Sequence, residues 1–171
     1  GHYDVHVTRG LGGEAFDPAL TSLDVTTAWP LPAAAQPFSQ TSTVFFQNGL
    51  AIGTWEAERI GDRLLVKLDW EVTRLADRRY KQFVHLIAAD GRRVAQGDAE
   101  PLGGFPPFTA WPLGARVPDT LTLTLPADTS PGTYALVTGL YDPVSGERLP
   151  VLADTGVVLG DSAGLGTVEV P

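Results

Sequence analysis

Residues 116–150 read RVPDTLTLTLPADTSPGTYALVTGLYDPVSGERLP, and this stretch determines how the rest of the chain is interpreted. Leucine and threonine alternate strictly over Leu121–Leu125, so an extended chain directs all leucines to one face and all threonines to the other. The Pro, Asp, Ser and Gly residues of 126–132 favour a turn, and an apolar run resumes over Thr133–Tyr141. A second turn signal follows at Asp142–Gly146. The stretch predicts an antiparallel β-hairpin with one buried and one solvated face.

Similar strand signals recur on both sides of this stretch, from Thr43 to the end of the chain. The Asn48–Gly49 pair separates two such runs and predicts a two-residue type I′ turn. Apolar residues hold alternate positions over Leu64–Val72, which places Trp70 in the core. No window shows the period of a helix, and the 14 prolines disfavour one. We therefore predict an all-β fold, an antiparallel two-sheet β-sandwich of immunoglobulin-like or jelly-roll type, with very little helix.

The first part of the chain differs in composition from the remainder. Glycines interrupt it, and its Pro- and Ala-rich stretch at 29–37 has the character of an extended linker. We expect residues 1–40 to be an N-terminal arm or the tail of a preceding segment, and residues 41–171 to form the sandwich. The chain contains no methionine, even at position 1, so we expect it to be a piece of a longer protein.

Composition excludes several classes of function. The absence of cysteine excludes a disulfide framework, a cysteine zinc site and a thiol nucleophile. A net charge of −8 argues against nucleic acid as a partner, although nine of the 12 basic residues lie between positions 59 and 93. We interpret that basic run as the solvated face of strands rather than as an anion site. No apolar stretch reaches the ~18 residues of a membrane span.

His85 is the histidine best placed for chemistry. A two-residue turn at Asp90–Gly91 would pair Ala89 with Arg92 and so place His85 opposite Gln96, with Asp98 a diagonal neighbour on the same face. Such a pair can orient a catalytic base, but the pattern supplies no nucleophile beside it. We therefore predict a structural polar pair, in which Asp98 satisfies a partly buried His85 imidazole.

Other catalytic and metal constellations are weaker. Asp98 and Glu100 could suggest a glycosidase pair, but Pro101 ends the strand and leaves Glu100 without a fixed geometry. His2 and His6 lack a nearby third ligand, so no metal site is expected. The sequence has no phosphate-binding loop, no dinucleotide glycine fingerprint and no HExxH motif, so no cofactor is expected either.

The loop over residues 102–112 is rich in aromatic residues, glycines and prolines. Phe105, Phe108 and Trp111 could form a rigid stacking platform for a sugar ring or a partner, which makes them candidate ligand-binding residues. The alternative is that the loop folds back and closes the open end of the sandwich, and we favour this alternative because loop aromatics often cover the edge of a core.

A series of short motifs occurs in a fixed order along the chain: Leu68–Glu71, Tyr80–Leu86, Asp90–Gly91, Val94–Gln96, Trp111–Gly114, Pro131–Tyr134, Gly139–Asp142 and Gly146–Pro150. The series resembles a β-sandwich module at the C-terminus of large multi-pass bacterial membrane proteins, many labelled as glycosyltransferases of the lipid-phosphate-sugar type. It is most similar to the versions from filamentous phototrophic bacteria. The resemblance covers about Val44–Val170, and Asp69 stands where the family commonly has a hydrophobic residue.

The resemblance implies an extracytoplasmic module in the cell envelope, tethered through a parent membrane protein and without catalytic residues of its own. We therefore expect a noncatalytic accessory domain that positions the enzyme or recognises its acceptor, with a glycan or the membrane portion of the parent as its partner. Two alternatives remain open. One is a free-standing carbohydrate-binding module that uses the aromatic loop, and the other is an enzyme that uses His85 and Asp98.

Overall fold

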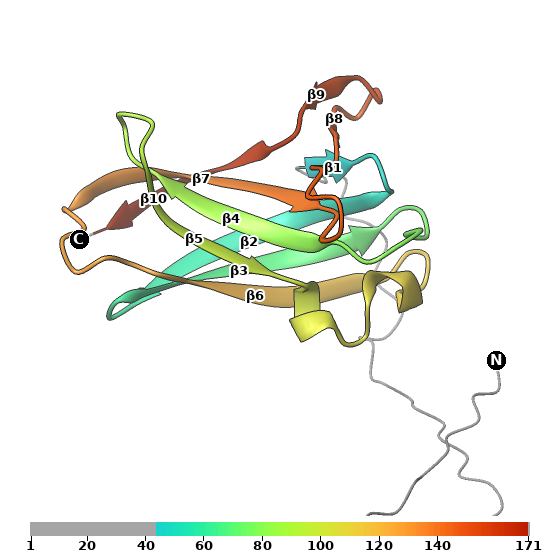
Figure 1. Ribbon diagram of the computed structural model, residues 1–171, viewed down its shortest axis with the longest axis horizontal. Coiled ribbons are helices and arrows are strands. Elements are labelled where there is room, and N and C mark those ends of the chain that lie inside the picture. Colours follow the sequence, from blue (N-terminus) through green and yellow to red (C-terminus); the bar gives the residue numbers. More distant parts are fainter. Residues whose placement is uncertain (1–43, 171) are drawn as a thin grey trace, which may run out of the picture.

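The computed structural model describes residues 44–170, which form two antiparallel sheets packed face to face (Figure 1). One sheet has six strands in the order β6-β3-β2-β1-β8-β9, and the other has four in the order β10-β7-β4-β5. The predicted all-β sandwich is therefore confirmed. The predicted arm over residues 1–40 lies outside the described residues, as do His2 and His6.

The strands alternate with short connections, and within residues 44–170 helix is confined to two 3-10 turns between β5 and β6. In chain order the elements are β1 Val44–Phe46, β2 Leu50–Ile60, β3 Arg63–Val72, β4 Lys81–Ile87, β5 Arg93–Ala99, η1 Pro101–Gly104, η2 Phe108–Ala110, β6 Arg116–Thr124, β7 Gly132–Tyr141, β8 Val151–Leu152, β9 Val158–Gly160 and β10 Ala163–Val170. The short strands β8 and β9 carry no clear alternation, and sequence analysis did not find them.

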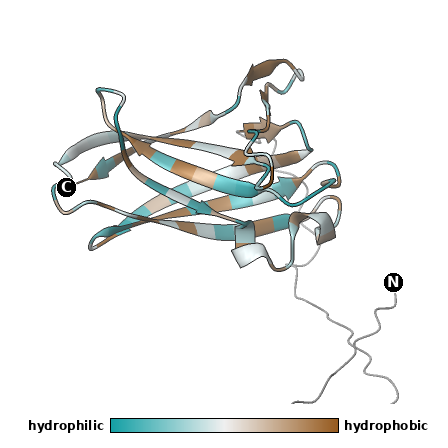
Figure 2. Ribbon diagram, viewed as in Figure 1, coloured by the Kyte–Doolittle hydropathy of each residue, from teal (hydrophilic) through white to brown (hydrophobic). Residues whose placement is uncertain are grey.

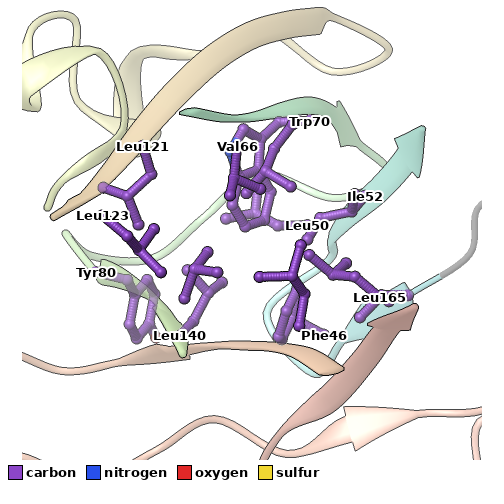
Figure 3. Close-up of a cluster of buried hydrophobic side chains, with 14 of the residues drawn as sticks. Phe46, Leu50, Ile52, Val66, Trp70, Tyr80, Leu121, Leu123, Leu140 and Leu165 are labelled. Atoms are coloured by element: carbon purple, nitrogen blue, oxygen red, sulfur yellow. The ribbon is translucent and has the colours of Figure 1, made fainter. Parts of the chain in front are cut away.

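Period-two burial builds the core as the sequence predicts. Figure 2 shows hydrophobic and hydrophilic residues alternating along the long strands. In β3 the buried residues Leu64, Val66, Leu68 and Trp70 face inward, and Lys67 between them is exposed. Trp70 is fully buried among side chains from both sheets (Figure 3), with its ring centroid 5.9 Å from that of Phe46.

Two of the predicted tight turns differ in detail. Asn48–Gly49 is not a type I′ turn, because Val44 pairs with Ile52 and a three-residue connection joins β1 to β2. Gly49 alone has positive φ, at 86°, and a side chain there would lie 2.2 Å from Cβ of Arg74. Close packing against the next loop therefore decides the shape of this turn.

The β4–β5 connection also differs, without changing the predicted register. Ala88 donates its N–H to the carbonyl of Arg92, so the turn contains one residue more than predicted. A bulge at Val94 then absorbs the extra residue, since Ile87 pairs with Arg93 and Leu86 with Ala95. The two deviations cancel, and His85 pairs with Gln96 as predicted.

Trp70 offers a direct test of this core. Replacing Trp70 with alanine should reduce the free energy of unfolding by ~3–5 kcal/mol, because the change removes a large buried ring and leaves a cavity. Chemical denaturation measures the loss. The control Val144→Ala, at a side chain that is 95% exposed, should change stability by less than ~0.5 kcal/mol. Equal losses in the two variants would contradict the assigned core.

Candidate functional site

His85 and Asp98 share the outer face of the four-stranded sheet, on β4 and β5. Phe83 pairs with Asp98 and His85 with Gln96, so Asp98 is the diagonal neighbour that the sequence predicts. Within residues 44–170, however, no hydrogen bond or ion pair joins the two side chains. The predicted polar pair is wrong in this respect. The imidazole is instead stacked on the ring of Phe83, with 4.6 Å between ring centroids, while Asp98 is exposed.

The surroundings of the His85 side chain favour its neutral form. Partial burial holds the pKa of His85 below its ordinary value of 6.5, because removal from water disfavours the charged form. The positive charges of Arg93 and Arg148 lower the pKa further, and the carboxylate of Asp98 opposes them. Asp98 therefore acts on His85 through its charge alone.

Phe83 is the centre of this outer-face cluster. Its ring is 2% exposed although it points away from the sandwich interior. The guanidinium of Arg148 lies 4.5 Å from the ring centroid, and a side chain at Gly139 would lie 2.4 Å from the ring. The cluster is packed as a small second core, which explains why His85 is partly buried.

The aromatic loop closes the core. Phe108 and Trp111 are 3% and 1% exposed, and Phe108 meets both Trp70 and Trp111 edge-on, at 5.6 and 4.6 Å between ring centroids. The indole N–H of Trp111 donates to the carbonyl of Pro106 at 3.0 Å. Phe105 is 71% exposed. The structure therefore agrees with the interpretation favoured from the sequence, in which the loop folds back over the core. The alternative, a platform of three exposed rings, is wrong because Phe108 and Trp111 are buried.

Polar contacts pin the same loop to the sandwich. Arg79 donates to Glu100 at 2.7 Å and to the carbonyl of Gly104 at 3.2 Å. Asp119 of β6 accepts the N–H of Leu102 at 3.0 Å and the side-chain amide of the buried Gln82. Glu100 is thus fixed by Arg79, contrary to the prediction that Pro101 leaves it without a defined geometry. The contacts of Arg79 and Asp119 therefore hold the loop in place while its apolar side chains cover the core.

A hollow of about 570 Å³, open to solvent, lies at one end of the sandwich, and we call it the end cavity. Three segments far apart in the sequence form its wall: the β1–β2 turn, the β3–β4 loop over residues 73–80, and the segment that leads into and through β8. The lining residues are Gln47, Asn48, Arg74, Leu75, Asp77, Tyr80, Leu149 and Leu152. Pockets of this size are typical of small-molecule sites.

Hydrogen bonds fix the shape of the end cavity. The carbonyl of Gly49 accepts the N–H groups of Thr73 and Arg74, at 2.8 and 3.0 Å. The guanidinium of Arg74 donates to the carbonyl of Gln47. Asn48 accepts the N–H of Leu50 through Oδ1 at 3.1 Å. Two neighbouring turns are therefore held together around the cavity mouth.

A charged network borders the cavity on one side. The hydroxyl of Tyr80 donates to Asp77 at 2.8 Å, and Arg78 bridges Asp77 and Asp142 at 3.1 and 3.2 Å. Burial, together with the bond to Asp77, raises the pKa of Tyr80 to about 12. The Tyr80 hydrogen bond is also the main cause of a lowered pKa at Asp77. Tyr80 is a neutral donor and Asp77 an ionised acceptor at physiological pH.

A second hollow, of about 520 Å³, lies along β2, β3 and β6. Polar side chains that line it bind one another: Thr54 donates to Asp69 at 2.6 Å, and Lys67 lies 3.8 Å from Glu56. The end cavity differs because three leucines, Leu75, Leu149 and Leu152, line it together with the polar side chains of Arg74, Asp77 and Tyr80. We therefore take the end cavity as the candidate functional site.

Sequence analysis missed the end cavity. Arg74, Asp77, Arg78 and Tyr80 fall in the region interpreted as a solvated basic run, and no short motif joins them to Asn48 or Leu149. The one local signal was the Asn48–Gly49 pair, which marks a turn but does not indicate what packs against it.

Comparisons with known proteins add little. No family model matches the chain, and no curated protein matches it. Among solved structures, the chain is similar to a beta-glucuronidase from glycoside hydrolase family 2, with a TM-score of 0.39 and 15% sequence identity. The match covers 62% of this chain and 11% of that enzyme, so the chain spans a small part of the enzyme's length. This likeness supports no statement about function.

Two features are absent from residues 44–170. No group of three or more His, Asp or Glu side chains in this range is placed to hold a metal ion. None of the helical turns in the range is long and apolar enough to span a membrane.

The lowered pKa of His85 gives a pH-dependent prediction. Because the unfolded chain binds this proton more readily than the folded chain, the free energy of unfolding should fall as the pH drops below 6.5 and level off below the folded pKa. Denaturation of wild type and His85→Gln across this range measures the effect, which should be smaller in the variant. In Asp98→Asn, NMR titration should show a still lower His85 pKa. An unchanged titration would mean that the carboxylate does not influence the ring.

The loop makes a separate prediction about stability. Trp111→Ala should reduce the free energy of unfolding by ~3–5 kcal/mol, because the ring is part of the core. The matched change Leu113→Ala, in the same loop but 66% exposed, should alter stability by less than ~0.5 kcal/mol. A small loss at Trp111 would show that the loop does not cover the core in solution.

Proposed function

We propose that this chain is a noncatalytic, extracytoplasmic β-sandwich module of a bacterial membrane glycosyltransferase-like protein. In this role it sits in the cell envelope, tethered through the parent protein, and positions the enzyme or recognises its acceptor. The observation that carries the proposal is that the candidate catalytic and ligand-binding residues make packing and anchoring contacts within the fold. His85 is stacked on Phe83, Glu100 anchors the loop through Arg79, and Trp111 is part of the core.

The family resemblance supports the proposed location of this chain in the cell envelope and its proposed attachment to a membrane protein. The motifs that carry the resemblance fall within residues 44–170, which are the residues that form the sandwich. Several of them coincide with the structural features described above: Leu68–Glu71 holds the buried Trp70, Tyr80–Leu86 holds Phe83, and Trp111–Gly114 belongs to the loop that covers the core. A module of this kind needs a stable scaffold, and these motifs supply it.

Recognition of an acceptor is supported by the end cavity. Its walls come from three segments that hydrogen bonds hold together, and its lining mixes apolar side chains with donors and acceptors. A largely pre-formed, mixed lining is typical of small-ligand sites. The acceptor of a glycosyl transfer outside the cytoplasm presents hydroxyl groups, which such a lining can bind.

The test uses the intact parent protein in membranes. Deleting the sandwich, residues 44–170 of this chain, should lower glycosyl transfer several-fold while the membrane portion still folds and binds its sugar donor. The isolated chain should transfer and hydrolyse nothing. Full transfer activity in the deletion variant would contradict the accessory role.

The alternatives correspond to other outcomes of the same work. Hydrolysis of a glycoside by the isolated chain, lost in His85→Ala, would replace the proposal with an enzyme that uses His85 and Asp98. Tight binding of the isolated chain to a glycan array, combined with unchanged transfer in the deletion variant, would favour a free-standing carbohydrate-binding module.

A further inference from the structure

The long strand β2 is paired along only part of one edge. On one side β3 pairs with it from Leu50 to Ile60, but on the other side β1 pairs only with Ala51 and Ile52. Figure 1 shows the short β1 beside one end of β2. No strand of residues 44–170 pairs with the β1 side of β2 over residues 54–58. An open strand edge of this kind is a template for the addition of another strand.

The backbone groups that face this open edge belong to Trp55 and Ala57. Val72 of β3 donates its N–H to Ala115, toward β6 and away from β2. Backbone groups alternate sides along a strand, so the β3 partners of Trp55 and Ala57 also direct theirs toward β6. The N–H and C=O groups of Trp55 and Ala57 therefore point away from β3, to the side on which the described residues provide no strand.

The core is incompletely covered beside the same edge. A groove of about 500 Å³, open to solvent, lies between β2 and β10. Trp55 and Ala57 pack against the core but are only partly buried, whereas their partners on β3, Leu68 and Val66, are 1% and 0% exposed. Val168 of β10, which also lines the groove, is partly buried as well. An apolar side chain seated in the groove would complete this side of the core.

The chain itself arrives at this edge. β1 begins at Val44, which pairs with Ile52, and it runs antiparallel to β2. A strand that continued β1 toward the N-terminus would therefore pass along the open edge of β2 in the direction of Ile60. Residues 37–43 precede Val44 directly and are as many as residues 54–60, so they match the edge in length. No other part of the chain outside the described residues connects so directly to this edge.

The residues just before Val44 have the composition of a strand at this position. Residues 37–43 read PFSQTST, in which Phe and Thr favour strands and Pro37 can end one because it has no N–H to donate. The stretch contains no charged side chain. It can therefore lie beside Glu56 and Glu58, which are exposed along the same edge, without electrostatic repulsion.

The alternation of β1 assigns a face to each of these residues. Val44 and Phe46 are buried and Phe45 between them is less so, so alternate positions before Val44 fall on the inner face. A strand over 38–43 would direct Phe38 into the groove. It would place hydroxyl side chains on the outer face, namely Ser39, Thr41 and Thr43.

We propose that residues 38–43 of this chain form a strand that extends β1 along the open edge of β2 and seats Phe38 in the groove between β2 and β10. The backbone groups of Trp55 and Ala57 then have a strand partner, and the added side chain covers the partly buried ring of Trp55. The placement of the strand does not depend on the proposed function.

The docked strand also fixes where the chain leaves the sandwich. Because the strand runs antiparallel to β2, the chain before Pro37 leaves at the β2–β3 turn. The end cavity lies at the other end, beside the β1–β2 turn. In a tethered module, a consequence that rests on the proposed function, the end cavity would point away from the attachment and stay accessible to an acceptor.

Disulfide cross-linking tests the strand in the full chain, which has no cysteine of its own. Carrying the Val44–Ile52 register past the bulge in β2 places Thr41 opposite Glu56 on the outer face. Directly opposite residues lie within the separation that a disulfide needs, so mild oxidation should join Thr41→Cys and Glu56→Cys within one chain.

The matched control combines Thr41→Cys with Thr120→Cys. Thr120 is exposed on β6, which β3 separates from β2, so this pair should not be joined within a chain. The proposal is wrong if the Thr41–Glu56 pair stays reduced or is joined no faster than the control pair. A disulfide between two chains would place a second copy at the edge and would equally overturn it.

Hydrogen exchange of the full chain, followed by NMR, gives an independent readout. The amides of Trp55 and Ala57 should be protected in wild type. Ser42→Pro removes a donor that the alternation of β1 points at β2, so it should lower this protection by about tenfold. The control Ala34→Pro, in the Pro- and Ala-rich stretch, should leave the protection unchanged. Exchange of both amides in wild type at the rate of an exposed chain would contradict the docked strand.

The two proposals can fail separately. If deleting the sandwich lowers transfer but the Thr41–Glu56 pair does not cross-link, the accessory role stands and the docked strand does not. If the pair cross-links within one chain but the deletion leaves transfer unchanged, the docked strand stands and the accessory role falls.

Discussion

The apolar core between the two antiparallel sheets must be shielded from water, both by the sheets and by the loops at the ends of the sandwich. Trp70 is shielded in both ways. It lies on the inward face of β3 through period-two alternation, and Phe108 from the β5–β6 connection packs against its edge at 5.6 Å between ring centroids. The loop therefore covers one edge of a fully buried tryptophan ring. Burial around Trp70 therefore governs both the strand pattern and the shape of the longest connection.

The need to cover the core also explains why polar residues near the β5–β6 connection have structural roles. The connection that covers Trp70 can stay in place only if its backbone and charged groups find partners, and Arg79, Asp119 and Gln82 supply them. On the outer face of the four-stranded sheet, His85 is stacked on Phe83 rather than bonded to Asp98. The end cavity is different, since leucine side chains line it together with Arg74, Asp77 and Tyr80.

Sequence analysis predicted the strands with period-two alternation well. Successive side chains of a strand point to opposite faces of the sheet, so alternating apolar and polar residues show which face is buried. The His85–Gln96 register was also correct, although the turn was one residue too short and the bulge at Val94 was not foreseen. The two deviations cancel because a bulge restores the facing of the side chains. The aromatic loop was harder to predict. Exposure of Phe105 and burial of Trp111 depend on how the loop folds back, and no local periodicity records this.

The amino-acid sequence by itself determined the fold class, the inward placement of Trp70 and the positions of most strands, since alternation and turn residues act over a few neighbours. Only the tertiary structure decided which aromatics are covered, that Glu100 meets Arg79, and that Asn48, Tyr80 and Leu149 surround one cavity. The last grouping joins segments as far apart in the chain as Asn48 and Leu149. Their contacts follow from how two sheets and their loops pack, which no short stretch of sequence specifies.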